Sequence, residues 1–158
     1  MKKIILLLLS LIMAVGIFGG CGKTEKPQGK NPSVKDISEK IKASTDLSNM
    51  KVGDENKLKK LYDIGSDEMA EFVLFTAPSN LKAEEIAILK LKDEKSLNTI
   101  KEKIEKRIEA QSKAFKDYLP DEYFLIEKRI LKTKDNYILF AISKDVDKIS
   151  SAFDECFK

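Results

Sequence analysis

The sequence predicts an α+β domain in which an antiparallel four-stranded sheet carries helices mainly on one face. Three observations support this prediction. Segments rich in strand-forming residues occur in two pairs, and turn-forming residues join the members of each pair. Each pair is followed by a segment with apolar residues at helical spacing. The resulting order ββα–ββα, after N-terminal helices, is typical of an antiparallel sheet built from hairpins.

Two short helices are expected before the first strand pair. Ser33 can cap the first helix, which runs to about Ala43, because a serine hydroxyl accepts hydrogen bonds from free amides in the first helical turn. The second helix covers residues 54–62. Both have their apolar residues on one side, which indicates that each has one buried face.

The strand pairs themselves are defined by their turns. The first pair comprises residues 72–76 and 85–92, with a proline-containing loop between them. The second pair comprises residues 123–132 and 137–143, and Lys134-Asp135-Asn136 between them is typical of a tight turn.

A long helix should follow the first pair, and a shorter one should follow the second. The long helix begins at Asp93 or Ser96, extends to about Tyr118 and is ended by Pro120. Asp145 caps the final helix. The long helix has one narrow apolar stripe, formed by Leu97, Ile100, Ile104, Ile108, Phe115 and Leu119.

The first 22 residues have the parts of an export signal. Lys2 and Lys3 give a positive start, an apolar run covers residues 4–18, and two glycines precede Cys21. The apolar run is shorter than the roughly 20 residues that a membrane span needs. We therefore expect a cleaved signal peptide rather than the alternative, an uncleaved anchor helix with an incidental cysteine.

Residues 18–21, Phe-Gly-Gly-Cys, resemble the lipobox of bacterial lipoproteins, although leucine is usual at the first position. The resemblance implies a diacylglyceryl group on the sulfur of Cys21 and cleavage after Gly20, so that residues 1–20 are removed. Residues 21–33 would form a flexible tether, since they contain two prolines and no large apolar residue. Residues 34–158 would be a single domain. The implied location is the extracytoplasmic face of the cell membrane, with membrane lipid as the partner through Cys21.

The composition excludes several kinds of site. Histidine is absent, which removes Ser-His-Asp and Cys-His catalysis and every metal site that contains histidine. Loss of Lys2 and Lys3 with the signal leaves 27 basic against 26 acidic side chains, so no nucleic-acid partner is expected. Cys156 is the only other cysteine, so lipidation of Cys21 leaves no internal disulfide. We predict no catalytic residue, metal site or cofactor.

One polar residue, Gln111, interrupts the apolar stripe of the long helix, and Arg107 lies one turn earlier at its edge. A buried amide and a guanidinium need hydrogen-bond partners, and Glu85 at the start of the second strand is the candidate. The three residues form either a structural network that holds the helix against the sheet, which we favour, or a polar pocket for a small ligand or peptide.

Four short segments of the domain resemble a family of uncharacterised lipoproteins from Gram-positive bacteria, known only as a domain of unknown function. The segments are residues 83–87 (AEEIA), 107–111 (RIEAQ), 118–120 (YLP) and 136–137 (NY). The resemblance covers roughly residues 34–157 and implies a location and a fold, but no reaction and no ligand. The family usually has glycine at position 136, and asparagine also tolerates the left-handed turn conformation.

Three functions are compatible with these features. The favoured one is a membrane-tethered, non-enzymatic domain that binds a protein or small ligand, because anchor and tether are present and catalytic groups are not. The second is a carboxylate-based enzyme with Glu84 or Glu85 and Arg107 in its site, which would need another acid about 5 to 9 Å away in a cleft. The third is a structural assembly subunit, suggested by apolar residues on both sides of strand 86–91.

Overall fold

The computed structural model describes residues 30–158, so the predictions that concern the signal peptide, Gly20 and Cys21 lie outside the described part. Within it, the chain forms a five-stranded antiparallel sheet and five α-helices. The predicted mixture of helices with an antiparallel sheet is therefore confirmed. No helix of residues 30–158 combines the length and the apolar character that crossing a membrane requires.

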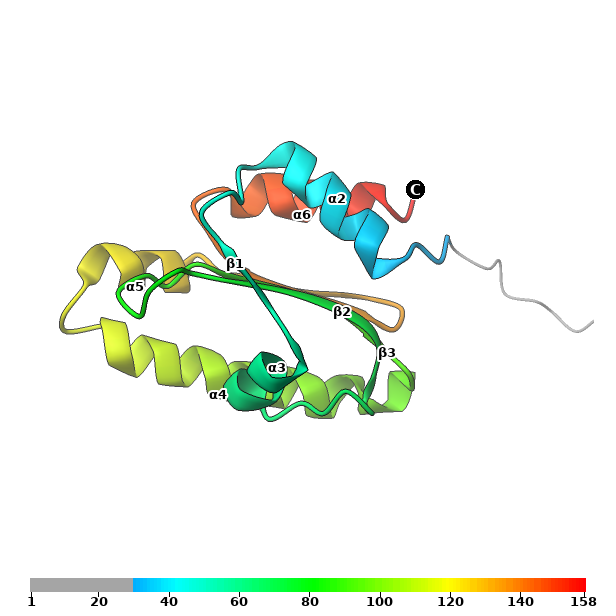
Figure 1. The fold of residues 1–158 in the computed structure, drawn as a ribbon, viewed down its shortest axis with the longest axis horizontal. Helices are drawn as coiled ribbons and strands as arrows, with labels where there is room; N and C mark the ends of the chain where they lie inside the picture. The colour runs from blue at the N-terminus through cyan, green and yellow to red at the C-terminus, as the bar shows by residue number, and fades with distance from the viewer. Residues whose placement is uncertain (1–29) are drawn as a thin grey trace, which may run out of the picture.

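The strands lie in the order β1-β2-β3-β5-β4, and every neighbouring pair is antiparallel (Figure 1). Their bounds are β1 Lys51–Gly53, β2 Met69–Thr76, β3 Glu85–Leu91, β4 Ile130–Lys134 and β5 Tyr137–Ile142. The helices are α2 Val34–Ser44, α3 Glu55–Tyr62, α4 Leu97–Phe115, α5 Pro120–Glu127 and α6 Val146–Glu155, with a 3₁₀ turn, η1 Glu94–Ser96, before α4.

The sheet has five strands rather than the predicted four, because β1 pairs with the end of β2 at the sheet edge. This strand has only three residues, and its one large apolar side chain, Val52, is exposed, so no alternating pattern marks it. Gly53 lies beside Leu74 of β2, and a Cβ atom at Gly53 would be only 2.7 Å from Leu74 Cδ2. The close approach explains why glycine ends this strand.

Helices cover both faces of the sheet, which corrects the prediction that they lie mainly on one face. Helices α2 and α6 cover one face, whereas α3 and α4 cover the other, as Figure 1 shows. The physical reason is β3, whose residues are apolar on both sides: Ile86 and Ile88 pack under α2 and α6, and Ala87 and Leu89 pack under α4. The apolar residues that suggested an assembly subunit are thus covered by the chain's own helices.

Residues 123–132, predicted to be one strand, are divided between α5 and β4. Pro120 starts α5 instead of only ending the preceding helix, because proline is favoured at the first helical position, where no amide is needed. Asp121 and Glu122 follow in the first turn, where carboxylates complement the helix dipole. Helix α4 ends at Phe115, three residues before the predicted end.

The predicted Ser33 cap of α2 is confirmed, and Asp54 caps α3 in the same way. Ser33 Oγ accepts a hydrogen bond from the Asp36 amide at 3.1 Å, and Asp54 Oδ1 accepts one from the Lys57 amide at 2.8 Å. Asp145 precedes α6, but its side chain makes no capping hydrogen bond.

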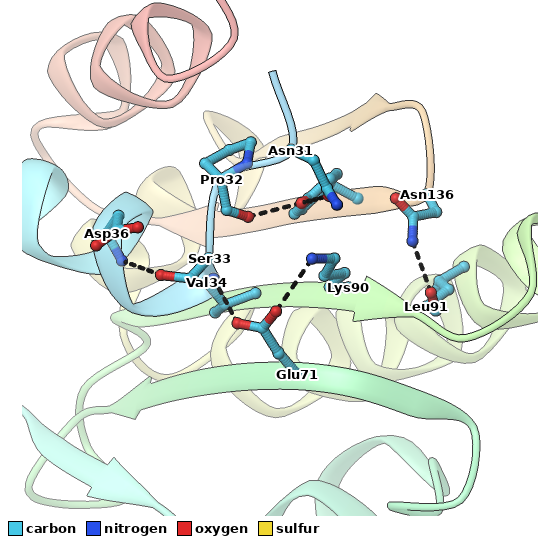
Figure 2. A network of polar contacts seen from close by, with 10 residues as sticks. Asn31, Pro32, Ser33, Val34, Asp36, Glu71, Lys90, Leu91 and Asn136 are labelled. Carbon is cyan, nitrogen blue, oxygen red and sulfur yellow. Dashed lines mark hydrogen bonds and ion pairs between the residues drawn. The ribbon is translucent and has the colours of Figure 1, made fainter. Parts of the chain in front are cut away.

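In the β4–β5 turn, Asp135 and not Asn136 adopts the left-handed conformation, with φ of 50°. Asn136 has a different role, because its Nδ2 donates to the Leu91 carbonyl at 2.7 Å (Figure 2). The side chain thereby ties the turn to the end of β3.

The last residues before α2 are held against the sheet, as Figure 2 shows. Tyr137 Oη lies 2.6 Å from both Asn31 Oδ1 and the Pro32 carbonyl, and Glu71 accepts a 2.8 Å hydrogen bond from the Val34 amide. Lys90 donates to the other oxygen of Glu71 at 3.0 Å. The last residues of the expected tether, Asn31 and Pro32, therefore make polar contacts with the sheet.

Candidate functional site

The three residues singled out in the sequence meet between α4 and the sheet. Glu85 opens β3 on the face covered by α3 and α4 and is only 2% exposed. Arg107 of α4 donates from Nη2 to Glu85 Oε2 at 2.7 Å and from Nε to Glu85 Oε1 at 3.2 Å. The planar guanidinium therefore makes a bidentate contact with both oxygens of the carboxylate, a geometry that lysine cannot reproduce.

Gln111 and Tyr62 complete this group. Gln111 Nε2 lies 3.4 Å from Glu85 Oε2 and 3.5 Å from the Ala83 carbonyl, and the Tyr62 hydroxyl of α3 donates to Glu85 Oε1. We call Tyr62, Glu85, Arg107 and Gln111 the Glu85 cluster. Sequence reasoning missed Tyr62, which looked like an ordinary apolar residue on the inner side of its helix.

Burial and mutual contact set the protonation of the cluster. Burial raises the pKa of Tyr62 well above its ordinary value, and the neighbouring charge of Glu85 raises this pKa further. Burial alone would lower the pKa of Arg107, but the hydrogen bonds and charge of Glu85 outweigh it, and the pKa of Arg107 is raised. Tyr62 thus remains a hydroxyl donor and Arg107 a cation throughout the physiological pH range.

One buried side-chain atom of the cluster has no partner within residues 30–158. Gln111 Oε1 is buried and accepts no hydrogen bond from residues 30–158. Rotating the amide by 180° would not help, because the atoms nearest Nε2 are a carbonyl and a carboxylate oxygen, both of which are acceptors. A buried acceptor without a donor costs about 1–3 kcal/mol, so this atom calls for an explanation.

A cleft of 390 Å³ lies over the cluster, between α3, α4 and the β2–β3 loop. This volume lies within the range of small-molecule sites. We call it the α3/α4 cleft; Lys57, Lys60, Leu61, Thr76, Ala77, Ser79, Asn80, Lys82, Glu84, Glu85, Arg107, Ala110, Gln111, Ala114 and Phe115 line it.

The loop that forms one wall of the cleft is held in place by Glu122 of α5. Glu122 is buried, and its two oxygens accept hydrogen bonds from Lys82 Nζ at 2.6 Å and from the Ala83 amide at 2.8 Å. In the sequence, Glu122 belongs to one of several acidic pairs and carries no distinguishing signal. The wall is therefore positioned by a contact between segments 40 residues apart.

The hydrogen bonds of Glu85 are relevant to the hypothesis that the protein is a carboxylate-based enzyme. Both oxygens of Glu85 already accept hydrogen bonds within its cluster, so this carboxylate is occupied in holding α3 and α4 to β3. Glu84 lines the same cleft as the remaining acid. Among residues 30–158, no group of three or more Cys, Asp and Glu side chains is arranged to hold a metal ion.

Residues 43–143 match the model of a protein family described as "Domain of unknown function (DUF4358)". The matched segment is well over half of the chain. The chain belongs to this family. The DUF4358 segment contains the whole Glu85 cluster and every residue of the α3/α4 cleft, whereas α6 and most of α2 lie outside it. Neither the comparison with curated proteins nor the comparison with solved structures found a match.

Proposed function

We propose that this DUF4358 protein is a lipid-anchored, extracytoplasmic domain that binds a ligand in the α3/α4 cleft without transforming it. The observation that carries the proposal is a cleft of ligand size lined by Gln111, a buried residue whose Oε1 has no partner among residues 30–158. A purely structural network would be expected to satisfy its own acceptors. A ligand that donates a hydrogen bond here would offset the cost of leaving the amide oxygen unpaired.

The anchoring half of the proposal is supported by the lipobox-like residues 18–21 and the basic, apolar stretch before them. A diacylglyceryl group on Cys21 would anchor the protein stably in the bilayer, because two acyl chains give stable membrane binding whereas a single chain gives only marginal binding.

The position of the cleft is consistent with this anchoring. The chain reaches the domain at the start of α2, whereas the β2–β3 loop that walls the cleft lies at the opposite end of the sheet, beside α5 (Figure 1). A domain tethered through residue 21 can therefore turn its cleft away from the membrane surface and towards molecules of the cell envelope.

Site-specific crosslinking in intact cells tests the proposal. A photoreactive amino acid placed at Ala110, an exposed small residue of the cleft wall, should yield adducts on irradiation, and mass spectrometry would identify the attached molecule. The same amino acid at Lys106, on the outer side of α4, is the matched control. A shared adduct pattern at both positions, or none at Ala110, would contradict binding in the cleft.

A further inference from the structure

The α3/α4 cleft is lined by more basic than acidic side chains. Four cations line it, namely Lys57, Lys60, Lys82 and Arg107, against two acids, Glu84 and Glu85. A low-dielectric concave wall concentrates the field of such charges. The cleft is thus suited to anionic ligands even though the mature chain as a whole is nearly neutral.

Two of these cations make no ion pair in the described part of the chain, and Glu84 is the one acid of the cleft that is likewise unpaired. Arg107 is paired with Glu85, and Lys82 is paired with Glu122, whereas Lys57 and Lys60 make no ion pair with any acid of residues 30–158. Both lysines lie on α3 at an i,i+3 spacing, so their side chains project from neighbouring positions of one helical surface. Two adjacent ammonium groups at a concave rim form a natural contact for a carboxylate or phosphate.

Two residues that line the cleft, Gln111 and Thr76, have hydrogen-bonding atoms without a partner in the described part of the chain. Gln111 Oε1 accepts nothing from the described chain, and Oε1 can only be satisfied by a donor. Thr76, which pairs with Glu85 across β2 and β3, lines the same cleft, and its hydroxyl makes no hydrogen bond within residues 30–158. The remaining lining combines the polar Ser79 and Asn80 with apolar residues, of which Leu61 and Phe115 offer surface for a short carbon skeleton.

We propose that the ligand is a small anion that also carries a hydrogen-bond donor. Its carboxylate or phosphate contacts Lys57 and Lys60, and its N–H or O–H group is directed to Gln111. This inference rests on the proposed function only in taking the α3/α4 cleft as the binding site. It adds the charge and the polarity of the molecule that the cleft selects.

Matched probes separate these two requirements. N-Acetylglycine has a carboxylate and an amide donor, N-acetylsarcosine keeps the charge but replaces that donor by a methyl group, and N-acetylglycine methylamide keeps the donor but lacks the charge. Glycerol 3-phosphate tests whether phosphate serves as well as carboxylate. Binding to the full lipidated chain in detergent is measured by calorimetry and by the shift of the thermal midpoint, with probes at about 10 mM because molecules this small reach millimolar affinity.

We expect N-acetylglycine or glycerol 3-phosphate to bind. N-Acetylsarcosine and N-acetylglycine methylamide should bind about tenfold more weakly or not at all, because each lacks one hydrogen bond or one charge contact. Lys57→Gln with Lys60→Gln should weaken both anions. Gln111→Leu should remove the preference for N-acetylglycine over N-acetylsarcosine. Lys101→Gln with Lys106→Gln on the outer side of α4 is the matched control and should change nothing.

Three results would overturn the inference. If N-acetylglycine methylamide binds as tightly as N-acetylglycine, the cleft does not select a negative charge. If N-acetylsarcosine binds as tightly as N-acetylglycine, the cleft does not select a hydrogen-bond donor. Absence of binding by every probe would reject the ligand class. In each case an adduct formed at Ala110 but not at Lys106 in cells would still support the proposed function, so the two failures are distinguishable.

Discussion

Arg107 of α4 and Glu85 of β3 are joined by two hydrogen bonds across the layer between helix and sheet, at 2.7 and 3.2 Å. Their side chains are 21% and 2% exposed, so the carboxylate is withdrawn from water and depends on protein donors. A charge in this position is stable only while its partner is present. The pair therefore makes a specific prediction about stability.

Replacing Arg107 should destabilise the protein strongly. Arg107→Ala leaves the buried Glu85 carboxylate with only Tyr62 and Gln111 as donors, and we expect the free energy of unfolding to fall by about 3 kcal/mol. Chemical denaturation measures the change. Arg107→Lys should recover only part of the loss, because an ammonium group cannot reproduce the two-pronged contact. Full stability in Arg107→Ala would contradict the structural role of the pair.

Gln111→Leu is the contrasting change at the same site, and it should leave the unfolding free energy of the ligand-free protein unchanged or raise it. Leucine fits the apolar stripe of α4 and removes the unpaired oxygen, and the Nε2 contacts that it also removes are long, at 3.4 and 3.5 Å. Ligand binding, in contrast, should be impaired. Clear destabilisation by Gln111→Leu would indicate that the amide is structural and would argue against the binding proposal.

Most elements of the fold could be predicted because their signals are local. The Ser33 cap of α2 and the apolar stripe of α4 each depend on residues within a few turns of one another in the sequence. The contact of Glu85 with Arg107 could be anticipated because a charged and an amide side chain on an apolar stripe require a partner.

The missed features depend on contacts between distant segments. The two-sided burial of β3 was visible in the sequence, but only the three-dimensional structure shows that α2 and α6 cover its second face. The helix α5 was missed because residues 123–132 have high strand propensity, and packing of Ile126 into the core overrides it. Likewise, no pattern in the sequence predicts the contact between Glu122 and Lys82 or the cleft that Gln111 lines.

Tyr137 should stabilise the domain through the chain segment that precedes α2. Tyr137→Phe removes the hydroxyl that lies 2.6 Å from the Pro32 carbonyl and from Asn31 Oδ1, and we expect a loss of about 1 kcal/mol in the free energy of unfolding. Tyr118→Phe is the control, since Tyr118 is 82% exposed. Amide hydrogen exchange at Ser33 and Val34 should accelerate only in the Tyr137 variant. Equal behaviour of the two variants would show that the segment is not held.

Glu71 should make stability depend on pH in the acid range. Burial alone would raise its pKa, but hydrogen bonds from the Val34 amide and Lys90, and the charge of Lys90, lower it below its ordinary value of 4.5. A lowered pKa in the folded state contributes stability that is present above pH 4.5 and is lost as the pH falls through the folded value. Thermal midpoints measured from pH 7 downwards should therefore drop less steeply for Glu71→Gln than for the unmodified protein. Parallel curves would contradict this assignment.

The boundary of the folded unit should lie before residue 31 rather than at residue 34. A chain that starts at residue 30 keeps the Ser33 cap and the contacts of Asn31 and Pro32 with Tyr137, so it should unfold cooperatively. A chain that starts at residue 34 should still fold, because the core lies within residues 34–158, but its unfolding free energy should be lower by about 2 kcal/mol. Identical denaturation curves would show that residues 31–33 add nothing to the stability of the domain.

Cys21 should carry the lipid, and its loss should detach the protein from the membrane. In the native protein, mass spectrometry should find Cys21 as the first residue and a diacylglyceryl group on its sulfur, because residues 18–21 resemble a lipobox. Cys21→Ala should remain unprocessed at Gly20, while Cys156→Ala, which removes the half-buried thiol of the folded domain, should be processed normally and provides the control. Recovery of a full-length chain with an unmodified Cys21 would refute anchoring. Since the cleft variants lie in a separate part of the chain, such a result would leave the binding experiments to decide the rest of the proposal.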